Sequence, residues 1–101
     1  MGGRRKKVMV QQYLVKGRVQ GVGFRWFVQY EAARIGLRGW VRNTDDGDVE
    51  VMAAGSPAQI EQLVLALHKG TRGSRVDKIE VHPLAESEGD ELQSFQIEGA
   101  W

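Results

Sequence analysis

The sequence contains no cysteine, which excludes disulfide bonds, thiolate metal sites and a cysteine nucleophile. It also lacks any run close to the ~20 apolar residues that a membrane-spanning helix requires. Neither sign of charge dominates, because 14 lysine and arginine residues nearly balance 13 aspartate and glutamate residues. Without a strong basic field, nucleic acid and acidic membrane surfaces are not expected partners. We expect a cytoplasmic protein that binds neither, and we expect it to be a monomer.

The length of 101 residues leaves room for one domain with two layers of secondary structure and a modest core. The basic excess is confined to residues 4–7, Arg-Arg-Lys-Lys, and such a short basic run near a terminus is most often solvated and mobile. We therefore expect residues 1–10 to form a flexible basic N-terminus and residues 11–101 to form a single domain.

The spacing of apolar residues predicts five strands and two helices. Alternation indicates a strand, whereas apolar residues three or four positions apart indicate a helix. The predicted elements are strand 12–19, helix 24–35, strand 37–43, strand 48–54, helix 57–69, strand 76–82 and a short strand 95–97. Ile79 and Val81 are expected to face inward, and residues 85–93 form either a loop or an edge element.

Local signals place the ends of these elements. Ser56, Pro57 and Gln59 match an N-cap, a first helical residue and a capping box, and Gly36 is placed to end the first helix. Residues 44–47, Thr-Asp-Asp-Gly, predict a hairpin turn between two strands. Their acidic residues lack the ligand spacing and flanking helices of a calcium loop.

The order β-α-β-β-α-β with a short extra C-terminal strand predicts an α+β fold, the ferredoxin-like sandwich. Its sheet is mostly antiparallel, and both helices cover one face. The strands before and after the first helix run in the same direction, because a crossover helix joins them. Their carboxyl ends therefore share one edge of the sheet, where the end of the first strand and Asn43, at the end of the second, are expected to face one site.

Residues 17–25, Gly-Arg-Val-Gln-Gly-Val-Gly-Phe-Arg, pass from a strand to a helix through two closely spaced glycines. Glycines let a loop bring its backbone amides close to a ligand. Amides at a helix start have no intrahelical partner and lie at the positive end of the helix dipole. Arg25 adds a permanent forked charge suited to phosphate or carboxylate. Taken alone, the glycines also fit an ordinary tight turn, and they match neither common nucleotide-binding motif.

Three segments together resemble the acylphosphatase family: residues 19–25 (VQGVGFR), residues 39–43 (GWVRN) and residues 46–50 (DGDVE). The likeness runs from roughly residue 15 to residue 97. It implies hydrolysis of a small acyl phosphate, a carboxyl–phosphate mixed anhydride, without a metal or another cofactor.

The resemblance also implies the site residues. Backbone amides would hold the phosphate, namely those of Gln20, Gly21, Val22, Gly23, Phe24 and Arg25. Arg25 and Asn43 would be catalytic, with Asn43 orienting the attacking water.

Two other functional classes compete with this one. An RNA-binding module shares the β-α-β-β-α-β order, but it needs aromatic residues on the open sheet face, where the third strand has Asp48 and Glu50. An acylphosphatase-like module that serves a larger carbamoyl-transfer enzyme, or one that only binds anions, stays an alternative.

The remaining candidate residues favour structural roles. His68 and His82 have no metal-ligand partner at a useful spacing, so both are expected at the surface. Three aromatic residues have two interpretations. They either form a recognition patch or, as we favour, pack near the edges of the sheet: Trp26, Tyr30 and Trp40.

Overall fold

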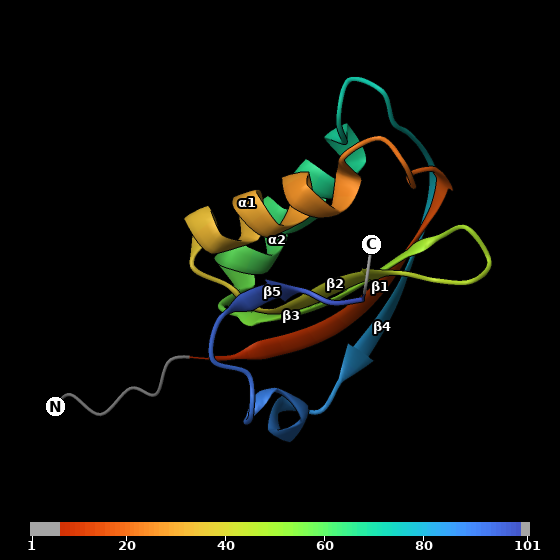
Figure 1. The fold of residues 1–101 in the computed structure, drawn as a ribbon. Coiled ribbons are helices and arrows are strands. Elements are labelled where there is room, and N and C mark those ends of the chain that lie inside the picture. Colours follow the sequence, from red (N-terminus) through yellow and green to blue (C-terminus); the bar gives the residue numbers. More distant parts are fainter. Residues whose placement is uncertain (1–6, 100–101) are drawn as a thin grey trace, which may run out of the picture.

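The computed structural model describes residues 7–99, which form a five-stranded sheet with two helices on one of its faces (Figure 1). The elements follow in the order β1 (Met9–Arg18), α1 (Phe24–Ile35), β2 (Arg38–Asn43), β3 (Val49–Gly55), α2 (Pro57–Lys69), β4 (Arg75–Leu84), the 3₁₀ helix η1 (Glu86–Gly89) and β5 (Phe95–Ile97). The strand order in the sheet is β4-β1-β3-β2-β5. The predicted ferredoxin-like fold with an extra C-terminal strand is confirmed.

Strand directions place the ends of β1 and β2 at one edge of the sheet, as predicted. Both strands pair antiparallel with β3, which lies between them, so they run in the same direction. β4 is antiparallel to β1, and only the short β5 adds a parallel pair, to β2. The loop after β1 and the last residue of β2 therefore occupy the same edge.

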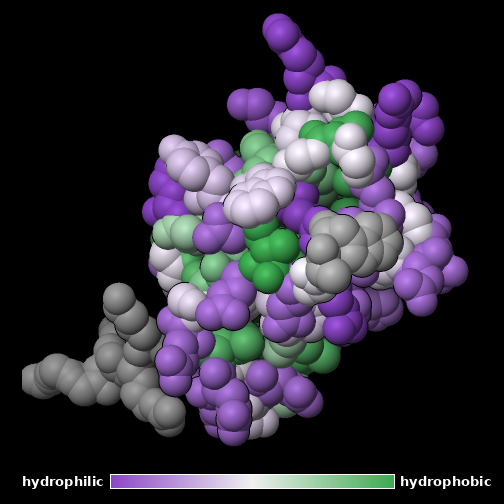
Figure 2. All heavy atoms as spheres, in the orientation of Figure 1, coloured by the Kyte–Doolittle hydropathy of each residue, from purple (hydrophilic) through white to green (hydrophobic). Residues whose placement is uncertain are grey.

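The core lies between the sheet and the helices. Alternate residues of the three central strands point toward the helices, and those of β1 and β3 include Tyr13, Val15, Val49 and Val51, all with no exposed surface. Each helix contributes one apolar stripe, with buried residues Phe24, Val28 and Ala32 in α1 and Ile60, Leu63 and Leu67 in α2. In the orientation of Figure 1, hydrophilic residues cover most of the visible face and hydrophobic residues appear between them as separate patches (Figure 2).

Both helices end and begin at the expected residues. The Ser56 side chain accepts a hydrogen bond from the Gln59 amide (3.2 Å), and the Gln59 side chain accepts one from the Ser56 amide (2.8 Å), so the capping box is complete. Gly36 ends α1 in the left-handed conformation with φ 97°. No helix among residues 7–99 is long and apolar enough to cross a membrane.

Several predicted boundaries and contacts differ from the structure. β1 already includes Met9 and Val10, and Val10 is buried, so the ordered strand begins inside the predicted N-terminal segment. The rest of that segment up to residue 6 lies outside the described residues. Within residues 85–93 the chain makes a 3₁₀ turn, η1. Val81 is 45% exposed rather than inward, because β4 is an edge strand with β1 as its one neighbour in the sheet.

The aromatic residues were only partly predicted correctly. Trp40 is half-buried, and the Arg42 guanidinium lies 4.7 Å from the centre of its ring. Trp26 and Tyr30, however, are 69% and 63% exposed, so the expectation that they pack near the sheet edges is wrong. Both lie on the side of α1 that faces away from its buried stripe, where no other element within residues 7–99 covers them.

Candidate active site

The loop between β1 and α1 turns through two glycines in the left-handed conformation. Gly21 has φ 74° and Gly23 has φ 75°, a region that L-residues rarely adopt. Gly23 is the N-cap of α1 and supplies no side-chain cap. Within residues 7–99, the backbone amides of residues 20–25 donate no hydrogen bond to another described residue. A row of free donors therefore stands at the start of α1.

Arg25 and Asn43 lie beside this loop, as predicted. Both line a hollow of about 200 Å³, which is walled by Val19, Gly21, Gly23, Phe24, Arg25, Trp26 and Asn43. The Arg25 side chain is half-buried, and its Nη1 donates to the Glu98 carbonyl oxygen at 3.3 Å. Asn43 is the last residue of β2, and its Oδ1 is buried without a hydrogen-bond partner among residues 7–99.

Two of the predicted phosphate-binding residues, Gln20 and Val22, do not line the hollow but make contacts that hold its walls. The Gln20 side chain donates from Nε2 to the carbonyl oxygens of Thr44 (2.9 Å) and Asp48 (2.7 Å). The Val22 carbonyl accepts from the Thr71 hydroxyl at 3.2 Å. The loop is thereby tied to the β2–β3 turn on one side and to the α2–β4 connection on the other.

The β2–β3 turn that follows Asn43 is closed by hydrogen bonds between its two ends. The Thr44 amide donates to the Asp48 carbonyl (2.9 Å), and the Asp48 amide donates to the Thr44 hydroxyl (3.1 Å). Lys16 Nζ lies 3.1 Å from Asp48 Oδ2, and this hydrogen bond and the Asp48 charge raise the pKa of Lys16 above its ordinary value. Asn43 is therefore held at the end of an ordered turn.

Comparisons with known proteins agree with this geometry. The family model described as Acylphosphatase matches residues 11–97. A curated relative named acylphosphatase from Koribacter versatilis is 54% identical over 91 residues, which cover 90% of this chain and 81% of the relative. The chain belongs to the acylphosphatase family.

Solved structures support the assignment at the level of the fold. The acylphosphatase from Bacillus subtilis superposes with a TM-score of 0.85 at 42% identity, covering 90% of this chain and 99% of that one. Full-length HypF, solved in a phosphate- and nucleotide-bound form, superposes with a TM-score of 0.82 at 28% identity. That match covers 97% of this chain and only 13% of HypF, so the same acylphosphatase fold also occurs inside a longer chain.

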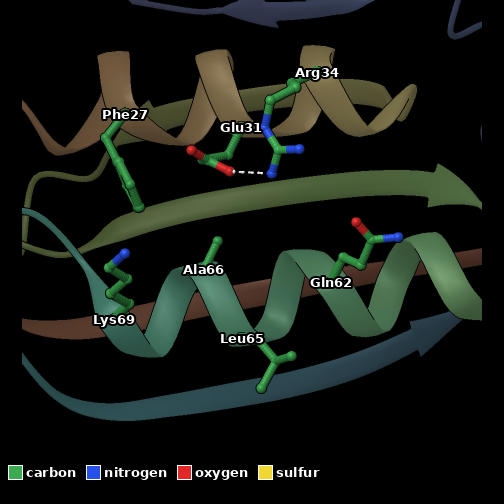
Figure 3. Close-up of a pocket in the computed structure, with 7 residues that line it drawn as sticks. All are labelled: Phe27, Glu31, Arg34, Gln62, Leu65, Ala66 and Lys69. Carbon is green, nitrogen blue, oxygen red and sulfur yellow. Dashed lines mark hydrogen bonds and ion pairs between the residues drawn. The ribbon is translucent and has the colours of Figure 1, made fainter.

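A second hollow, of about 260 Å³, lies between α1 and α2 and has different chemistry (Figure 3). Its walls include Phe27 and Leu65, and its charged residues are partly paired, because Arg34 Nη2 lies 2.7 Å from Glu31 Oε1. It contains no glycine loop and no helix start. For a member of the acylphosphatase family, the hollow at the β1–α1 loop is the candidate active site, and the groove between the helices is not.

Other candidates from the sequence stay apart from the site. His68 and His82 are both exposed, as expected. Among the described residues, no group of three or more histidine, cysteine, aspartate or glutamate side chains is arranged to hold a metal ion.

Sequence reasoning missed the side-chain contacts of Gln20 and the Glu98 carbonyl that accepts from Arg25. Neither has a local signal, since the partners lie 24 or more positions apart in the chain.

Proposed function

We propose that this chain hydrolyses acyl phosphates to a carboxylate and inorganic phosphate, with the phosphate held by the amides of residues 20–25 and with Arg25 and Asn43 as catalytic residues. Family membership and the solved acylphosphatase neighbours support acylphosphatase activity, which acts on the carboxyl–phosphate bond. The roles of Arg25 and Asn43 rest on the geometry of the hollow that both residues line. The amides of Gln20 and Val22 are included because the resemblance to the family implies them, since neither residue lines the hollow.

The observation that carries these roles is the unpaired Oδ1 of Asn43, buried in a residue that lines the hollow. Leaving a buried acceptor unsatisfied costs on the order of 1–3 kcal/mol, so such groups usually have a ligand or a water as their partner. A water bound beside Asn43 supplies the missing hydrogen, and the carboxamide in turn orients that water toward the phosphorus.

The reaction needs electrostatics more than proton transfer. The leaving group of an acyl phosphate is a carboxylate, a weak base that needs no strong general acid. The enzyme must neutralise the phosphoryl oxygens and place one water in line with the breaking bond. The loop amides and Arg25 provide the positive charge and the donors, and Asn43 places the water.

An amide is a poor base, so the water loses its proton late, to an oxygen of the substrate. A phosphate monoester is a worse substrate, because its alkoxide leaving group requires an acid that the walls of the hollow lack. No step calls for a metal, since Arg25 and the amides already face the charge. We further propose that the chain acts as a single-domain monomer in the cytoplasm.

The test is the rate of benzoyl phosphate hydrolysis in the presence of a metal chelator, for the wild type and for Arg25→Gln. Arg25→Gln keeps a polar but shorter side chain and removes the charge, and we expect kcat to fall on the order of 10³-fold or more. Circular dichroism and urea unfolding establish that both proteins are folded. If the folded wild type has no activity, the alternative of an anion-binding or accessory module replaces this proposal.

A further inference from the structure

The hollow at the β1–α1 loop has one apolar wall that the fold itself does not use. Three of its lining residues have large apolar side chains: Val19, Phe24 and Trp26. Val19 and Phe24 are each 1% exposed and belong to the core. Trp26 is 69% exposed, so it is the one large apolar side chain of this wall that still has free surface for a ligand.

The position of Trp26 on α1 explains this exposure. Phe24, Val28 and Ala32 form the buried stripe of the helix. Trp26 is two positions, or about 200°, from Phe24 around the helix axis, so it projects away from the core. Tyr30 is one turn further along the same side and is 63% exposed. Together the two residues make an aromatic strip that begins at the hollow and runs along α1.

The shape of an acyl phosphate indicates which part of the substrate lies against this aromatic strip. When its phosphate binds the loop amides and Arg25, the rest of the molecule must leave a hollow of only about 200 Å³ that also holds the attacking water. The acyl group then extends past the walls next to Arg25, and Trp26 directly follows Arg25 in the chain. A flat apolar acyl group can lie against an indole ring, whereas a methyl group makes little contact with it.

We propose that Trp26, continued by Tyr30, binds the acyl group and selects acyl phosphates with flat, apolar acyl groups over small ones such as acetyl phosphate. This inference rests on the proposed function, because it assigns the acyl end of the same site. Trp26 is a specificity residue here and does not take part in bond breaking.

The test compares kcat/KM for benzoyl phosphate and acetyl phosphate in the wild type, Trp26→Ala and Trp26→Phe. Comparing this benzoyl-to-acetyl ratio between variants cancels the difference in reactivity between the two substrates, because that difference is the same for every variant. We expect Trp26→Ala to lower the benzoyl-to-acetyl ratio about 3- to 10-fold, as the loss of one aromatic contact predicts, mainly by raising KM for benzoyl phosphate. Trp26→Phe keeps an aromatic surface and should restore most of the ratio.

Leu65→Ala is the matched control, because Leu65 is equally exposed at 68% but lines the groove between the helices instead. It should leave the ratio at the wild-type value. An unchanged ratio in Trp26→Ala, or an equal loss with both substrates, overturns the inference while the proposed function stands. A folded wild type that hydrolyses neither substrate overturns both.

Discussion

The two helices of this protein begin in opposite ways. α2 starts with a complete capping box of Ser56 and Gln59, and Pro57 at its first position has no amide hydrogen to satisfy. α1 starts at Gly23, which has no side chain to cap it, and Arg25 places a cation in its first turn. A cation there opposes the helix dipole, which favours anions at this end. The start of α2 is satisfied within the fold, whereas the start of α1 leaves its amides free for the anion that we propose binds there.

Asn43→Ala gives the largest effect among the changes that sharpen this contrast, since Asn43 lines the same hollow as the start of α1. Losing one preorganised polar group typically costs on the order of 10²–10³ in kcat, and we expect that loss with benzoyl phosphate. Stability should not fall correspondingly, because the change removes a buried acceptor that has no partner. Steady-state kinetics measures the loss of kcat, and urea unfolding measures the stability. A fully active variant would show that Asn43 has no part in the mechanism.

The two ends of α1 offer an intermediate test. Gly23→Ala and Gly36→Ala both place a Cβ at a left-handed residue, with φ 75° and 97°. Each should lose about 1–2 kcal/mol in the free energy of unfolding. Only Gly23→Ala should also lower kcat/KM, by about tenfold, because it displaces amides that face the hollow. Equal activity in the two variants would show that the conformation of Gly23 matters for folding alone.

Ser56→Ala gives the smallest effect. It removes the side-chain acceptor at the start of α2 and should cost about 1 kcal/mol of stability. Activity with benzoyl phosphate should stay at the wild-type level, because Ser56 does not line the hollow. Thermal unfolding measures the loss of stability, and the benzoyl phosphate assay measures the activity. A loss of turnover in a folded Ser56→Ala protein would mean that the two helix starts are not independent.

The features that could be predicted from the sequence are those that depend on residues close together in the chain. The period of the apolar residues marked both helices and all five strands, and Ser56, Pro57 and Gln59 marked the start of α2. The direction of β1 and β2 follows from the crossover helix, which is why Asn43 could be placed at the edge beside the loop.

What could not be predicted depends on packing between distant segments. The exposure of Val81 follows from the edge position of β4. That of Trp26, in contrast, follows from the helical period itself, which places Trp26 on the side of α1 opposite the buried stripe. The hydrogen bonds from the Gln20 side chain to the carbonyl oxygens of Thr44 and Asp48 join the β1–α1 loop to the β2–β3 turn. These two segments lie 24 and 28 positions apart in the chain. No periodic pattern in the sequence records such contacts.

The bond between Arg25 and the Glu98 carbonyl has a consequence for the order in which activity appears during folding. Its partners are 73 positions apart, while the Glu98 amide donates to the Val41 carbonyl at 2.8 Å beside β5. Contacts between residues so far apart close slowly, because they require a long loop to be ordered first. The hairpin of β2 and β3 and the turns of α1 rely on near neighbours in the chain. We therefore expect turnover in a refolding experiment to return no earlier than the contacts of β5, since the Arg25 side chain reaches its carbonyl partner only when that segment has docked.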